Sequence, residues 1–85
     1  MKLTITHTYP NPDNLDTTKT DIFTKYGEEA DLIDTALKVV EGTLKKYNPA
    51  ALTHMEQQLH VDDYASANYE IEGLKCSFKV QLSAP

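Results

Sequence analysis

Residues 23–47 read FTKYGEEADLIDTALKVVEGTLKKY, and apolar side chains recur in this stretch at steps of three and four residues. The apolar positions are Phe23, Tyr26, Ala30, Ile33, Leu37, Val40, Leu44 and Tyr47. This spacing predicts one long amphipathic α-helix whose stripe faces the interior of the protein. Asn48 and Pro49 end the helix, because proline disfavours helical geometry in the residue before it. The helix is expected to begin near Thr20 or Asp21, and Gly27 is a candidate break that leaves a short first turn and a main helix from about residue 28 to residue 47.

A second apolar line lies beside this stripe in the middle of the helix. It consists of Leu32, Ala36 and Val39, which we call the helix flank. The two lines together span an arc wider than the roughly 100° that a one-sided surface helix buries. Two interpretations stay open. Either residues 50–61 or the first strand covers the helix flank, or a protein partner or a second copy of the chain packs on it. The helix flank is therefore the candidate interaction site.

The C-terminal third predicts a β-hairpin. Residues 65–71 and 74–82 alternate apolar with polar side chains, and the phase of the alternation reverses at Gly73. A two-residue turn at Glu72 and Gly73 aligns all the apolar residues on one face, and glycine suits the positive φ that such a turn requires. The predicted pairs are Ile71 with Leu74, Tyr69 with Cys76, Ala67 with Phe78 and Ala65 with Val80.

The N-terminal segment also alternates, and residues 2–9 predict a half-buried strand. Its inward side chains are Leu3, Ile5, His7 and Tyr9. The next segment, residues 10–20 with the sequence PNPDNLDTTKT, is rich in turn residues and predicts a polar loop. Such a loop is long for a compact domain, so we interpret it as either mobile or involved in binding.

Residues 50–61 are compatible with two structures. As a helix, the segment has Asn48 as its cap, Pro49 at its first position and an apolar stripe. As a strand, it alternates in register with the hairpin, and we favour the strand. The stripe of the helix would be Leu52, Met55 and Leu59; the alternating positions of the strand would be Thr53, Met55, Gln57, Leu59 and Val61.

The sequence thus predicts a single α+β domain over residues 1–85, with two layers. One long α-helix packs on a three- or four-stranded, mainly antiparallel sheet in the order β-α-(β or short α)-β-β.

Composition argues against several classes of function. The chain of 85 residues has a net charge of −5, and its eight basic residues are all lysine. The absence of arginine argues against sequence-specific recognition of nucleic acid, because arginine makes most bidentate contacts to phosphate and guanine. The N-terminus lacks a secretory apolar run, and the lone Cys76 cannot form an internal disulfide. We therefore expect a cytoplasmic protein without a membrane span.

Few residues suggest chemistry. His54 and His60 are six residues apart, a spacing that brings two histidines to one metal ion in neither a helix nor a strand. Cys76 occupies an inward position of the last strand, with no His or Arg close in sequence to activate its thiol. Three scattered glycines exclude a glycine-rich phosphate loop. We accordingly expect no enzymatic activity, no cofactor and no metal.

Three functional hypotheses follow. The leading one is a small non-catalytic interaction module that forms a homodimer, or docks on a protein partner, through the helix flank or a sheet edge. The alternative is a nucleic-acid or ribosome-associated domain that uses Lys75, Lys79 and Tyr64 on the polar face of the sheet. The third is a small-molecule or metal binder that uses His54, His60 and the loop 10–20.

Overall fold

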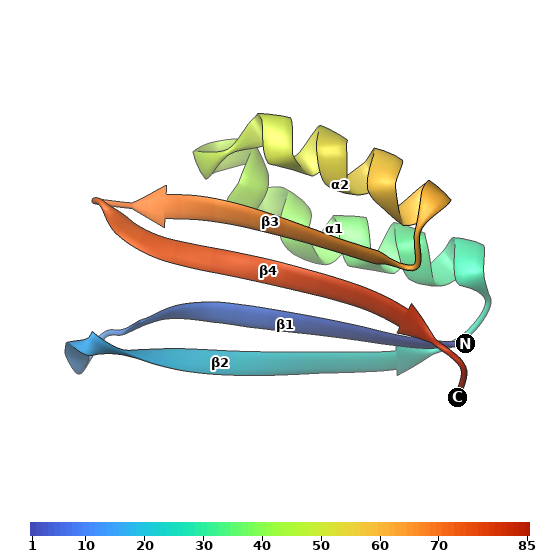
Figure 1. Ribbon diagram of the computed structural model, residues 1–85, viewed down its shortest axis with the longest axis horizontal. Coiled ribbons are helices and arrows are strands. Elements are labelled where there is room, and N and C mark those ends of the chain that lie inside the picture. The colour runs from blue at the N-terminus through green and yellow to red at the C-terminus, as the bar shows by residue number, and fades with distance from the viewer.

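The computed structural model covers residues 1–85 and contains four strands and two helices. The elements are β1 (Lys2–Asn11), β2 (Asn14–Tyr26), α1 (Glu29–Tyr47), α2 (Pro49–Val61), β3 (Tyr64–Ile71) and β4 (Leu74–Ser83). The strands form one antiparallel sheet in the order β2-β1-β4-β3. Figure 1 shows the β1–β2 hairpin on the opposite side of β4 from β3 and α2. The α+β architecture is confirmed in outline, with two helices in place of one.

The C-terminal hairpin has the predicted register. Ile71 pairs with Leu74, and the ladder continues through Tyr69 with Cys76 to Ala65 with Val80. The turn residues Glu72 and Gly73 have φ values of 52° and 79°. Two successive positive φ values match the right-handed twist of the flanking strands, which explains why the chain reverses here.

Residues 10–26 differ from the prediction. The polar loop 10–20 is not found, because β1 continues to Asn11 and β2 begins at Asn14 after a two-residue turn. The side-chain oxygen of Asn11 accepts a hydrogen bond from the backbone N–H of Asp13 at 3.0 Å, an interaction that stabilises tight turns. The assignment of Phe23 and Tyr26 to the helix was also wrong. Both lie in β2, where threonine and aromatic residues favour the extended backbone and the ladder to β1 overrides their helical spacing.

The preference for a strand at residues 50–61 was wrong, and the helical interpretation holds. The side-chain oxygen of Asn48 accepts a hydrogen bond from the backbone N–H of Ala51 at 3.3 Å, and Pro49 is the first residue of α2. This cap satisfies a backbone donor that the first turn of a helix leaves free. Met55 and Leu59 then face the interior and are almost fully buried.

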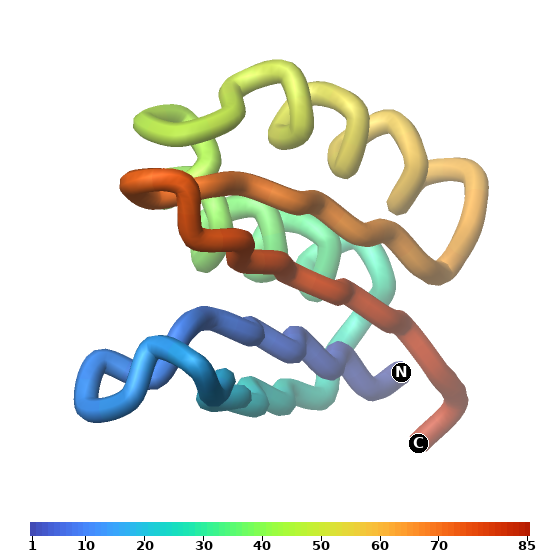
Figure 2. The backbone as a smooth tube through the Cα atoms, turned by 60° about the vertical axis from the view of Figure 1, so that its left-hand side comes forward, coloured from blue at the N-terminus to red at the C-terminus, as the bar shows by residue number.

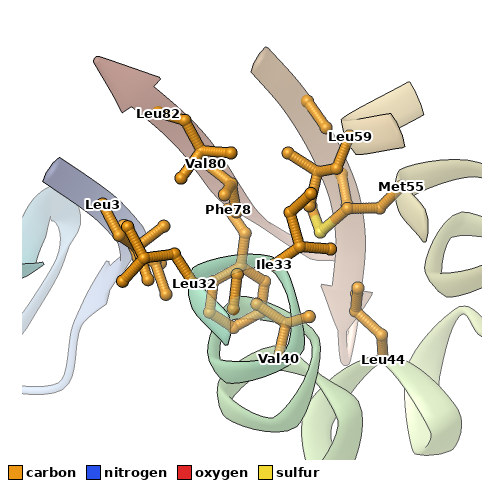
Figure 3. Packing of buried hydrophobic residues seen from close by; sticks show 14 of the residues in the cluster. Leu3, Leu32, Ile33, Val40, Leu44, Met55, Leu59, Phe78, Val80 and Leu82 are labelled. Atoms are coloured by element: carbon orange, nitrogen blue, oxygen red, sulfur yellow. The ribbon is translucent and has the colours of Figure 1, made fainter. Parts of the chain in front are cut away.

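The core lies between the helices and the sheet. It contains sixteen buried residues, all of them apolar, and no buried polar side-chain atom lacks a hydrogen-bond partner. Figure 3 shows side chains of α1 and α2 meeting those of β1 and β4 in this layer. Figure 2 shows the β1–β2 hairpin from another side, again separated by β4 from β3 and α2. No residue of β2 belongs to the core. Neither helix has the length and apolarity needed to cross a membrane.

Candidate interaction surface

Strand β2 forms one edge of the sheet and is exposed along its whole length. Four large apolar side chains lie on it: Ile22 is 67% exposed, Tyr26 is 63% exposed, Leu15 is 58% exposed and Phe23 is 41% exposed. A strand that contributes nothing to the core and carries large apolar residues is unusual. Large apolar residues exposed along a sheet edge make that edge a candidate surface for contact with another molecule.

The backbone of β2 has a defined outward direction. The amine of Met1 donates to the carbonyl of Gly27 at 2.9 Å, and the N–H of Gly27 donates to the carbonyl of Met1 at 3.1 Å. Bonded and non-bonded pairs alternate along an antiparallel ladder, so the odd-numbered residues of β2 bond to β1. The pairing of Thr18 with Pro10 agrees, because proline has no N–H to contribute. The N–H and C=O groups that point away from the sheet therefore belong to Thr18, Thr20, Ile22, Thr24 and Tyr26.

The side chains of β2 divide between the two faces of the sheet. Phe23 is opposite Ile5, and Asp21 is opposite His7, so the odd-numbered side chains share the face that the helices cover. Lys19 and Lys25 are on this same face. The even-numbered side chains, including Ile22, are on the other face. Phe23 is thus flanked on its own face by an acidic residue two positions before it and a basic residue two positions after it.

A groove separates β2 from α1. It has a volume of about 230 Å³, and Phe23, Val39 and Thr43 are among the residues that line it. Val39 is 44% exposed, so it is the member of the helix flank that solvent reaches. The sheet edge and the remaining exposed part of the helix flank are therefore two walls of one groove.

The other two residues of the helix flank lie inside the protein. Leu32 and Ala36 are fully buried. Leu32 belongs to the same buried cluster as Leu3 of β1, both are drawn in Figure 3, and a side chain at Gly27 would contact Leu32. The core of the protein itself therefore covers this part of the flank, as the first of the two open interpretations expects. A partner would reach Val39 and not Leu32 or Ala36.

His7 anchors an aromatic cluster on the helix-covered face of the sheet. Its Nε2 is 2.5 Å from the hydroxyl of Tyr69, and its ring stacks on Phe78 with the ring centroids 4.2 Å apart. Burial lowers the pKa of His7, and the charge of Asp21 partly opposes this shift. The hydroxyl of Tyr9 donates to the carboxylate of Asp21 at 2.9 Å, which raises the pKa of Tyr9. The imidazole is thus held by stacking and by a hydrogen bond at the edge of the core.

The remaining candidate residues for chemistry are dispersed. His54 and His60 are exposed on α2, and no group of three or more His, Cys, Asp or Glu residues is close enough to hold a metal ion. Cys76 is buried, and its Sγ lies 3.7 Å from the carbonyl oxygen of Leu74. A larger hollow of about 580 Å³ lies at the far end of α1, between Tyr47 and the β3–β4 hairpin, and its lining includes Glu70.

The residues of the nucleic-acid hypothesis share the open face of the sheet without forming a basic patch. Lys75 is opposite Glu70, and Lys79 is opposite Ser66. Tyr64 is at the other end of β3 from Glu70 and is 41% exposed. An acidic residue directly across from one of two lysines weakens the attraction for phosphate groups.

The sequence interpretation missed β2 altogether, and with it Ile22 and Phe23 as surface residues. The signal that could have found the strand is the run of β-branched and aromatic residues in TTKTDIFTKY, residues 17–26. Apolar alternation is weak there because neither face of β2 is buried. Comparison with protein-family models, with curated proteins and with solved structures finds no match to this chain.

Proposed function

We propose that this protein is a small, non-catalytic cytoplasmic interaction module that associates with itself through the edge of β2. One observation carries the proposal: the outward backbone groups of Thr18–Tyr26 are unpaired beside the exposed side chains of Ile22, Phe23 and Tyr26. An exposed edge strand is a template for another strand, and main-chain hydrogen bonds supply the affinity of such pairing. The single reduced thiol of Cys76 is compatible with the cytoplasm.

The two edges of the sheet differ in how open they are. On β3, the side-chain amide of Asn48 donates to the carbonyl of Asn68 at 2.7 Å. Asn68 is one of the β3 residues whose backbone points away from β4, so this bond occupies the middle of that edge. On β2, residues Thr18–Tyr26 include no proline, and their pairing with β1 has no register shift. The β2 edge therefore supports the proposal better than the β3 edge.

The helix flank contributes to the proposed contact through Val39 alone. Val39 and Phe23 line the same groove, so a strand added to β2 would have its helix-side residues close to the mouth of that groove. We expect a weak to moderate association in the micromolar range. A single strand pair buries less surface than a standard protein interface.

The test is sedimentation velocity of the purified chain over a series of concentrations up to millimolar. Thr24→Pro removes an outward N–H of β2 without removing a bond to β1, because Thr24 is a non-bonded partner of Thr4. We expect the wild type to form a larger species and Thr24→Pro to stay monomeric with an unchanged circular dichroism spectrum.

The matched control is Ser66→Pro, which removes an outward N–H from the β3 edge in the same way. This variant should associate like the wild type. A wild-type chain that stays monomeric at every concentration would overturn the proposal. Loss of association in Ser66→Pro alone would move the contact to the other edge.

A further inference from the structure

We infer that two copies of the chain pair β2 with β2 antiparallel, about a two-fold axis that passes beside Phe23, so that assembly closes as a dimer. The inference rests on the proposed function, because it specifies the partner and the register of the same edge. It is carried by the direction of the backbone groups and by the order of charges on β2.

The backbone direction limits the possible registers. The outward N–H and C=O groups belong to even-numbered residues from Thr18 to Tyr26. Hydrogen-bonded pairs between two such edges must therefore join an even-numbered residue with an even-numbered residue of the partner. Odd-numbered residues then face odd-numbered residues, and both sets of helices lie on the same face of an eight-stranded sheet.

Charge and the pairing of Phe23 together select one register among these. With Phe23 opposite the partner's Phe23, Asp21 is opposite the partner's Lys25, and the symmetric pair repeats on the other side of the axis. The central pair is a non-bonded pair, in which side chains approach most closely, so the two phenyl rings cover each other. Bonded pairs form between Ile22 and the partner's Thr24 and between Thr20 and the partner's Tyr26. Asp21 and Lys25 are about 13 Å apart along their own strand, so neither neutralises the other within one chain.

The neighbouring registers place like charges together or lose the aromatic pair. With Ile22 on the axis, Lys19 is opposite the partner's Lys25 twice, and with Asp21 on the axis two carboxylates meet. With Thr20 on the axis, Lys19 is opposite the partner's Asp21, but Phe23 then falls opposite Thr17, outside the regular ladder of β2. Opposite charges across strands are favourable and like charges are unfavourable. The charges of β2 therefore act against the registers with Ile22 or Asp21 on the axis, and loss of the Phe23 pair acts against the register with Thr20 on the axis.

The same edge also argues against an open assembly. Pairing β2 with the β3 edge of another copy would be heterologous and would continue as a ring or a filament. The bond from Asn48 to Asn68 occupies that β3 edge. Self-pairing of β2 uses one surface twice, leaves no free β2 edge and stops at two copies.

Charge reversal tests the register in solution. Lys25→Asp places a carboxylate opposite the partner's Asp21 at both symmetric contacts, so we expect the dimer to weaken about tenfold or more in sedimentation equilibrium. Asp21→Lys should weaken it similarly, and the double variant Asp21→Lys with Lys25→Asp should restore most of the affinity. If Ile22 lay on the axis, Lys25→Asp alone would strengthen the dimer, because the new carboxylate would face the partner's Lys19. That outcome would overturn the inferred register.

Cross-linking gives a second measurement that does not depend on charge. In a Cys76→Ala background, Phe23→Cys should form a covalent dimer under mild oxidation, because a non-bonded pair brings Cα atoms to about 4.5 Å. Ile22→Cys is the matched control and should cross-link much more slowly. Faster cross-linking of Ile22→Cys would refute the register, and species larger than a dimer would refute the two-fold closure.

The outcomes also separate the inference from the proposed function. If the wild type is monomeric and Thr24→Pro changes nothing, both fail. If Thr24→Pro abolishes association but charge reversal and cross-linking disagree with the Phe23 register, the β2 edge stands and the inferred geometry fails. Restoration by the double charge reversal together with cross-linking at position 23 supports both.

Discussion

Replacement of Val40 by alanine should destabilise the protein, whereas the same replacement at Val39 should have almost no effect. The two valines are neighbours in α1 and have the same chemistry, but Val40 is fully buried and Val39 is 44% exposed. Comparison of the two substitutions therefore separates the effect of burial on stability from the effect of helix propensity. It also tests the conclusion that only Val39 of the helix flank faces solvent.

The magnitude follows from the two methyl groups that each change removes. At Val40, lost transfer free energy is about 1.6 kcal/mol at ~0.8 kcal/mol per buried carbon, and the cavity left behind adds about 1 kcal/mol. The higher helix propensity of alanine offsets roughly 0.5 kcal/mol of this loss in the free energy of unfolding. The net loss is about 2 kcal/mol, a large share of the roughly 4–13 kcal/mol that a domain of this size possesses. At Val39, about half of the transfer term and no cavity term apply, so the net change is within ~0.5 kcal/mol.

Urea denaturation followed by circular dichroism measures both variants at one protein concentration, because self-association would otherwise shift the midpoint. We expect Val40→Ala to lower the midpoint by roughly 1–2 M with an unchanged slope, and Val39→Ala to stay near the wild type. Equal losses in the two variants would refute the packing described for α1. A large loss at Val39 alone would show that the groove beside β2 is closed in solution.

Two further predictions concern the β3–β4 turn and the aromatic cluster. Gly73→Ala should lower the free energy of unfolding by about 1 kcal/mol, because Gly73 has a φ of 79°, which alanine adopts only at a cost. A clash does not contribute, because an added Cβ would meet nothing within 4 Å. Gly42→Ala, at an equally open site inside α1, should instead raise it by up to ~1 kcal/mol; thermal unfolding of both variants compares the signs. The lowered pKa of His7 in the folded protein means that its contribution to stability is complete above the unfolded pKa near 6.5 and is lost as pH falls below it. The free energy of unfolding from urea titrations between pH 7.5 and 5 should therefore fall by no more than about 1.4 kcal/mol per pH unit, and His7→Phe should flatten the profile; a steeper fall in the variant would contradict the assignment.

The sequence allowed the C-terminal hairpin to be predicted down to its register. The alternation of residues 65–82 reverses phase at Gly73, and both strands have one buried face. A period of two is unambiguous under those conditions, because a slip of one residue would expose every apolar side chain. Likewise, the part of the helical stripe from Ile33 to Leu44 corresponds to the buried face of α1.

The N-terminal half was harder for a physical reason. Strand β2 buries neither face, so it has no apolar alternation to detect, and Phe23 and Tyr26 happened to extend the helical spacing of α1 backwards. In α2, Met55 and Leu59 fit both a period of two and a helical step of four, and only the Asn48–Pro49 cap distinguished the alternatives. The candidate surface was missed for the same reason as β2, since a residue's position at a sheet edge depends on strand order, which the sequence does not encode locally.

The strand order also has a consequence for how the chain folds. The polypeptide is a succession of three local hairpins, β1–β2, α1–α2 and β3–β4, each joined by a short connection. Among the strand pairings, only that of β1 with β4, from Lys2 with Ser83 to Thr8 with Ser77, links opposite ends of the chain. Local units close early, whereas a contact between distant segments pays a large loop-closure entropy. The meeting of β1 and β4 is therefore the step at which the two β-hairpins become one sheet on which the helices pack, and the rate of folding should respond most to changes in the β1–β4 ladder.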